Sequence, residues 1–248
     1  MSFIQDLGAM VWKEMREFFS SGGGRGRYIG LIVLGIFGVV LPLFSGSADW
    51  AGSIVPPIEF GLYLPVILIL SVGADSFAGE RERHTLETLL ASRLPDRAIF
   101  FGKLLAITLF GWAQSLLAAV VALVVVNLKI HAGLELYSGA NILVIAGIGL
   151  LASLLGAAAT SLVSLRAATV RQAQQILSVG LLVIILGSTF GIQALPPSAR
   201  LKLLTTIATS SFTTLALDGA AILAVATAIL VLAAMALFRR ARLILSGS

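Results

Sequence analysis

Residues 80–103 read ERERHTLETLLASRLPDRAIFFGK, and this charged stretch interrupts a chain that is otherwise largely apolar. Apolar runs at 60–78 and 99–126 lie on either side of it, and each is close to or above the roughly 20 residues that cross a bilayer. Paired charges are costly in hydrocarbon, so the residues between the two runs must stand in water. The sequence therefore predicts a charged loop that joins two membrane spans.

Composition favours the same class of protein. Apolar residues make up 58% of the 248 and charged residues only 12%, which is typical of a polytopic helical membrane protein. The apolar runs are continuous, whereas the strands of an outer-membrane barrel would alternate. The chain has no cysteine, which excludes disulfides, thiolate catalysis and cysteine-ligated metal.

We therefore expect an all-α fold in one transmembrane domain over residues 1–248. The six predicted spans are 28–44, 60–78, 99–126, 141–165, 176–195 and 219–238. Alternating the loops between two sides leaves only Lys129, Arg200 and Lys202, of 17 lysines and arginines, on one side. The positive-inside rule then predicts that both termini are cytoplasmic. The net charge of +5 reports this topology, and no basic soluble domain favours nucleic-acid binding.

The first 21 residues are predicted to form an amphipathic helix in the membrane interface. The apolar face consists of Ile4, Leu7, Val11, Met15 and Phe18. Glu14 falls near the middle of this face. Either its side chain snorkels to water or the helix is rotated about its axis, or Glu14 is a buried carboxylate that faces a partner or another segment.

The charged loop, residues 79–97, shows helical order. Its leucines recur at i, i+3 and i+4, and the pairs Glu80 with Arg83 and Arg83 with Glu87 have helical spacing. Pro95 is expected to end the short helix, and Asp96 to start the third span. The leucines of this stripe are Leu86, Leu89 and Leu90.

The ordered series in this loop resembles the signature of membrane subunits of ABC exporters of the ABC-2 class. That signature has a GluArgGlu cluster, ThrLeuGlu, LeuLeu, a proline, and GlyLys at the start of the third span. The matching residues are Glu80, Arg81, Glu82, Thr85, Leu86, Glu87, Leu89, Leu90, Pro95, Gly102 and Lys103. His84 stands where the family commonly has glycine or another residue. The six spans and the N-terminal surface helix resemble the same family over almost the whole chain.

The resemblance implies a permease subunit of the bacterial inner membrane, which forms an export path with a second copy or a homologous permease. Residues 80–95 would be a coupling helix that docks on a separate ABC-type ATPase, present in two copies. The residues expected to couple are Glu80, Arg81, Glu82, Arg83, Thr85, Leu86, Glu87, Leu89 and Leu90. The chain itself lacks the phosphate-binding pattern GxxxxGK[ST], so ATP and magnesium belong to the partner. We expect no catalytic residue, cofactor or metal in this chain.

Small residues recur along the fourth predicted span, at Ala152, Gly156 and Thr160 among others. They predict close helix packing, or a smooth surface along the transport path. Gln114 in the third span is ambiguous in the same way. Residues 195–217, with two prolines and eight Ser or Thr, predict a pair of short re-entrant helices or an ordinary external helix.

Other function classes fit less well. A membrane-embedded enzyme is disfavoured, because the two histidines lie on opposite sides of the predicted bilayer. A secondary transporter or channel usually carries ionisable groups at membrane depth, whereas Glu59 and Asp75 lie near the two ends of the second span. A noncatalytic scaffold or immunity subunit would share the predicted topology. In every case, membrane lipid is the surrounding partner.

Overall fold

The computed structural model describes residues 3–20, 25–44, 50–129 and 134–238. The elements in chain order are α1 (Phe3–Ser20), α2 (Arg25–Gly35), the π-helical turn η1 (Ile36–Val40), α3 (Leu41–Phe44), the π-helical η2 (Pro57–Tyr63), α4 (Leu64–Glu82), α5 (Leu86–Leu90), α6 (Asp96–Lys129), α7 (Gly139–Arg166), α8 (Val170–Ala194), α9 (Pro197–Thr209) and α10 (Phe212–Leu237). No strand occurs within these described ranges. The prediction of an all-α fold is confirmed for this part of the chain.

Five helical segments in the described residues are long and apolar enough to cross a membrane. They are Pro57–Glu82, Asp96–Lys129, Gly139–Arg166, Val170–Gly187 and Phe212–Leu237. The predicted first span falls on α2, η1 and α3, where the apolar helical part, Gly30–Phe44, is shorter. Its 15 residues cover about 22 Å, less than the roughly 30 Å of a hydrocarbon core.

Helix α6 is the longest element. Its 34 residues extend over about 51 Å, so it reaches well beyond the hydrocarbon core of a bilayer. The helix begins at Asp96, as predicted, directly after Pro95. The carbonyl of Pro95 accepts hydrogen bonds from the backbone N–H groups of Ala98, at 2.8 Å, and Ile99, at 3.2 Å.

Helix α7 lies at the centre of the bundle and packs against α4, α6 and α10. The small residues of the predicted fourth span face these neighbours, and Ala152, Gly156 and Thr160 are all buried. A β-carbon added at Gly73 of α4 would collide with the side chain of Thr160. The stripe is therefore a packing surface inside the bundle, because only small residues allow such a close approach. Gln114 is half-buried on α6.

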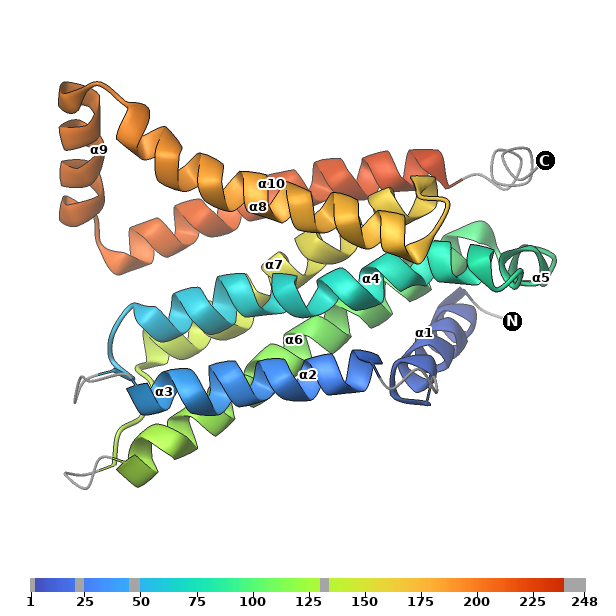
Figure 1. The fold of residues 1–248 in the computed structure, drawn as a ribbon, viewed down its shortest axis with the longest axis horizontal. Helices are drawn as coiled ribbons and strands as arrows, with labels where there is room; N and C mark the ends of the chain where they lie inside the picture. Colours follow the sequence, from blue (N-terminus) through green and yellow to red (C-terminus); the bar gives the residue numbers. More distant parts are fainter. Residues whose placement is uncertain (1–2, 21–24, 45–49, 130–133, 239–248) are drawn as a thin grey trace.

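Helices α8 and α10 run alongside the bundle, and α9 links their ends (Figure 1). The prediction of two short helices over 195–217 was wrong: one short helix, α9, is followed directly by α10. The side chain of Ser211 accepts a hydrogen bond from the backbone N–H of Thr214 and caps α10. Residues 212–217 therefore form the first turns of α10.

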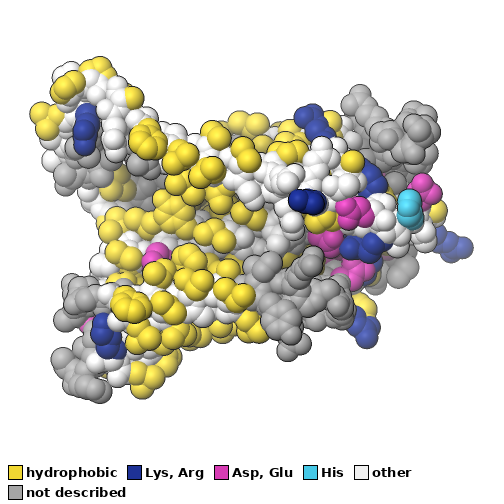
Figure 2. Space-filling view, viewed as in Figure 1, with side chains coloured by type: hydrophobic (Ala, Val, Ile, Leu, Met, Phe, Trp, Pro, Cys, Tyr) yellow, Lys and Arg dark blue, Asp and Glu magenta, His cyan; other side chains and the backbone are white. Residues whose placement is uncertain are grey.

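Most charged side chains on the face shown in Figure 2 gather at one end of the molecule, beyond a broad apolar belt. We call this the charged end. It contains the loop from α4 to α6 with its short helix α5, the turn from α7 to α8, and the nearby helix α1 (Figure 1). The signature residues of the sequence all belong to this end.

Candidate functional site

A buried lysine lies at the centre of the charged end. The ammonium group of Lys103 on α6 is 2.9 Å from a carboxylate oxygen of Glu14 and 2.9 Å from one of Glu80. It also donates a hydrogen bond of 2.9 Å to the backbone carbonyl of Ser76 and lies 5.4 Å from the centre of the Phe77 ring. Only 1% of the Lys103 side chain is exposed. All three hydrogen-bonding positions of this ammonium group are therefore used.

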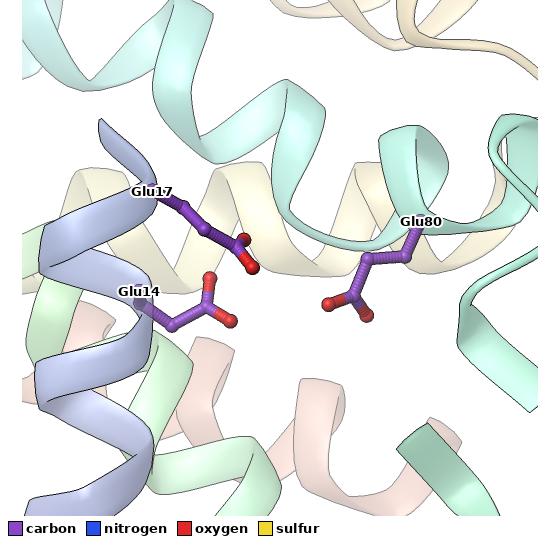
Figure 3. A group of neighbouring side chains, drawn as sticks. All are labelled: Glu14, Glu17 and Glu80. Carbon is purple, nitrogen blue, oxygen red and sulfur yellow. The ribbon is translucent and has the colours of Figure 1, made fainter. Parts of the chain in front are cut away.

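The two carboxylates that pair with Lys103 come from helices far apart in the sequence. Glu14 lies on α1 and Glu80 near the end of α4, and both are buried. Figure 3 shows their side chains, with that of Glu17, directed toward a common space. The pairing joins α1, α4 and α6 at one point. We call these residues, with Lys13, the ion-pair network.

Lys13 closes the network at its exposed side. Its ammonium group lies 3.0 Å from Glu80, 3.1 Å from Glu14 and 3.2 Å from Glu17. Burial disfavours the charged form of Lys13, but the charges of Glu14, Glu80 and Glu17 outweigh this effect and raise its pKa above the ordinary value. Lys13 therefore stays protonated at neutral pH.

The three carboxylates could in principle bind a cation, because one oxygen of each lies within 4.8 Å of the others. Lys13 and Lys103 already bring two positive charges to the same oxygens. A metal ion would have to displace an ammonium group from a buried pair, which is unfavourable. The geometry is that of a structural salt-bridge network.

Two of the sequence expectations are decided here. Glu14 is not a snorkelling residue: its side chain is 2% exposed and pairs with another segment. Glu80 was expected among the residues that couple to the ATPase, but its side chain is buried and pairs with Lys13 and Lys103 within the chain. Its position at the end of an apolar helix, opposite a lysine on α6, is the physical reason, since a buried charge needs a close counter-charge.

Arg81 and Glu82 tie the loop to the turn between α7 and α8. The Arg81 guanidinium donates hydrogen bonds to the backbone carbonyls of Leu165, at 3.0 Å, and Ala167. Glu82 accepts a hydrogen bond of 3.0 Å from the backbone N–H of Val170, the first residue of α8. Carbonyls at the end of a helix and N–H groups at its start lack hydrogen-bond partners within the helix. Arg81 therefore supplies donors to the end of α7, and Glu82 supplies an acceptor to the start of α8.

The rest of the loop, after residues 80–82, faces solvent with most of its side chains. Arg83 pairs with Asp75 at 3.2 Å, so the predicted pairs with Glu80 and Glu87 do not form. His84 has a left-handed backbone conformation, with φ of 56°, and turns the chain sharply before α5. The side chains of Thr85 and Glu87 are exposed.

Helix α5 sits on the bundle through the leucine stripe. Leu86 is 6% exposed, and Leu89 is partly buried against the same apolar cluster, which includes Phe100 and Leu165. The side chain of Leu90 lies outside the described part of the structure. The predicted short helix therefore exists over Leu86–Leu90, and it presents Glu87 and Thr88 to solvent.

The sequence interpretation assigned no structural role to Lys103 or Lys13. Lys103 was read only as part of a GlyLys signature, although it is a lone charge within an apolar stretch. Glu14 is the matching anomaly, a lone acid on an apolar helical face. Two isolated opposite charges on different apolar faces are a usable signal for a buried pair.

Comparison with known proteins agrees with these features. A family model described as ABC-2 family transporter protein matches residues 38–239, which is most of the chain. No curated protein matches the chain significantly. The match spans the charged loop, the buried Lys103 and the five helical segments of the described residues that are long enough to cross a membrane. The chain is therefore a multi-pass membrane permease that belongs to the ABC-2 family of transporter proteins.

Proposed function

We propose that this chain is the membrane subunit of an ATP-driven exporter and that a separate ABC-type ATPase docks on the exposed side of the loop over residues 83–95. ABC-2 permeases generally work with an ABC ATPase and as dimers. We further propose that two copies of this chain, or one copy and a homologous permease, enclose the path, with two ATPase subunits. Both termini and the charged end then face the cytoplasm, as the distribution of lysine and arginine predicts.

The observation that carries this proposal is the attachment of an exposed loop to several helices through ion pairs and hydrogen bonds. The loop begins at Glu80, whose carboxylate is held by Lys103 and Lys13, and it is tied to the turn between α7 and α8 through Arg81 and Glu82. A partner that pushes on α5 therefore acts on α1, α4, α6 and α7 together. A loosely tethered loop would absorb the same displacement.

The docking face consists of exposed polar residues around α5. Arg83, His84, Thr85, Glu87 and Thr88 are exposed. Glu87 and Thr88 are best suited to a partner, because Arg83 also pairs with Asp75 within the chain. Leu86 packs in the apolar cluster of the bundle and so anchors α5 to it. Residues 80–82 then belong to the attachment of the coupling segment.

The test is copurification with the ABC-type ATPase encoded beside this chain. Glu87→Arg reverses an exposed charge on α5, and Asp218→Arg reverses an exposed charge near the start of α10, which lies at the opposite end of the bundle from α5 (Figure 1). We expect Glu87→Arg to reduce the retained ATPase at least tenfold, as loss of a charge pair at an interface costs about 2 kcal/mol or more. Asp218→Arg should retain it, and both variants should keep the thermal stability of the unmodified chain.

Equal retention of the ATPase by both variants would show that Glu87 is not part of the docking interface. Absence of any ABC-type ATPase from both the neighbouring genes and the purified complex would favour a secondary transporter, a channel or a noncatalytic scaffold.

A further inference from the structure

A groove lies on the outside of the bundle, between the start of α6 and the end of α10. Its volume is about 310 Å³, which is at the lower end of the range of small-molecule sites. The lining side chains are Asp96, Arg97, Phe100, Leu232, Met235, Ala236 and Phe238. Five of these seven are apolar, so the groove has an apolar wall and a charged rim.

Two buried aromatic rings form the floor of the groove. Phe100 and Phe238 are 1% and 5% exposed, and their ring centres lie 5.7 Å apart. Leu232 and Ala236, on the last turns of α10, are exposed. The groove therefore opens away from the bundle core, toward the surroundings of α10, and does not lead into the middle of the bundle.

The groove also lies at a particular depth. Helix α10 is an apolar segment of 26 residues that ends at Leu237, and the groove spans its final two turns. At the same level α6 begins with Asp96 and Arg97. Apolar side chains thus give way to charged ones within the groove, as at the boundary between the acyl chains and headgroups of a leaflet.

Arg97 supplies a positive charge at this rim. Its side chain is exposed, and it forms no ion pair with the residues that the structure describes. Arg93, in the link between α5 and α6, is exposed four residues earlier in the chain. Asp96 is the one acid of the rim and has an interaction of its own.

From this combination we propose that the groove binds one anionic phospholipid. An acyl chain lies along Leu232 and Met235 on the floor formed by the two phenylalanines, and the phosphate faces Arg97. Arg97 favours an anionic headgroup over a zwitterionic one, because an arginine near an anionic headgroup contributes about 1 kcal/mol, or about fivefold in affinity. This lipid is a bound component on the outer surface of the bundle, and its binding does not depend on the ATPase.

The experiment is a lipid titration of the full-length chain, with whatever subunits copurify, in mild detergent. Retained lipid is counted by native mass spectrometry for dioleoyl phosphatidylglycerol and for dioleoyl phosphatidylcholine. The unmodified chain should prefer phosphatidylglycerol. Arg97→Gln should lower that preference about fivefold, whereas Arg93→Gln, which removes a neighbouring exposed charge outside the groove, should change it less than twofold. Equal retention of the two lipids by the unmodified chain, or an unchanged preference in Arg97→Gln, would overturn the proposal.

A second pair of variants tests the apolar wall. Ala236→Phe fills the groove, and Ala224→Phe adds the same ring at an exposed position of α10 outside it. Ala236→Phe should lose most of the bound phosphatidylglycerol and its stabilisation in thermal unfolding, while Ala224→Phe should keep both. If both variants retain the lipid equally, the groove is not its site.

Discussion

When an ammonium group is removed from water, the protein must supply a counter-charge and three hydrogen-bond acceptors in place of the solvent. Lys103 obtains them from Glu14, Glu80 and the carbonyl of Ser76. The stability of such a site depends on completeness, because removing one partner leaves the others buried without compensation. The ion-pair network is therefore a sensitive point of the charged end.

Replacing Lys103 by Met tests this dependence. The variant leaves Glu14 and Glu80 buried with a single remaining counter-charge, Lys13, and should lower the free energy of unfolding by about 3–5 kcal/mol. Lys13→Met is the matched control. The Lys13 side chain is 38% exposed, so solvent screens its pairs and the loss should be about 1 kcal/mol or less. Thermal or denaturant unfolding in detergent would measure both, and equal losses would contradict the assigned centre of the network.

Single residues were the part of the site that the sequence predicted least completely. The pattern of charges identified the loop correctly, but it assigned Glu80 to the exposed face. Helical spacing along one segment cannot reveal a partner 89 positions away, which is the separation of Glu14 and Lys103. Only the packing of α1 on α6 brings these residues together.

At the scale of elements, close approach between helices decides what can be substituted. Helix α1 packs on α6 where Gly102 faces Met10, and an added β-carbon there would lie 2.5 Å from the Met10 side chain. This contact is one turn or less from the ion-pair network on both helices. The position of α1 therefore depends on the absence of a side chain at Gly102 as well as on the ion pairs.

Gly102→Leu should consequently displace α1. The chain has no cysteine, so a cysteine introduced at Met10, which is 1% exposed, reports directly on this contact through maleimide labelling. Labelling should rise severalfold in Gly102→Leu. Gly147→Leu is the control, because an added β-carbon at Gly147 would meet nothing within 4 Å. A Met10 cysteine that stays protected in both variants would show that α1 holds its position without the glycine.

The packing of α4 on α7 gives a second pair of glycines that differ in the space around them. Gly73→Ala should destabilise the protein by about 1–3 kcal/mol, since its β-carbon collides with Thr160. Gly156→Ala should be tolerated, because its nearest neighbour, Ile69, would lie at an ordinary contact distance of 3.7 Å. Unfolding of the two variants side by side checks this. A larger loss in Gly156→Ala would mean that the helices approach differently.

Elements were largely predictable from the sequence, because a membrane span is a continuous apolar run that needs no knowledge of its neighbours. Five of the six predicted spans correspond to helices of spanning length in the described residues. The remaining one, the first predicted span at 28–44, corresponds to a shorter helical stretch. The segment at 195–217 was less predictable. Its threonines and serines are compatible with loop or helix, and only the cap at Ser211 fixes where α10 begins.

At the scale of the whole molecule, the charged end connects most of the helices of the bundle to the short exposed helix α5. The ion-pair network joins α1, α4 and α6, and Arg81 with Glu82 adds the junction of α7 and α8. Helix α10 completes this end through Phe238, which packs on Phe77 and Phe100. Force applied at α5 therefore has a direct structural route to most of the spans.

The proposed function requires an ATPase that contacts α5 from the inner side of the membrane. Thr88 is exposed on α5, and Thr88→Cys would be the sole cysteine of the chain. A bifunctional crosslinker attached to this cysteine, in cells that express the transporter with its ATPase, measures the contact most directly. We predict a crosslinked product that contains the ATPase, and protection of the cysteine from membrane-impermeant maleimide applied outside. A cysteine that is labelled from outside, or one that never captures the ATPase, would contradict the account.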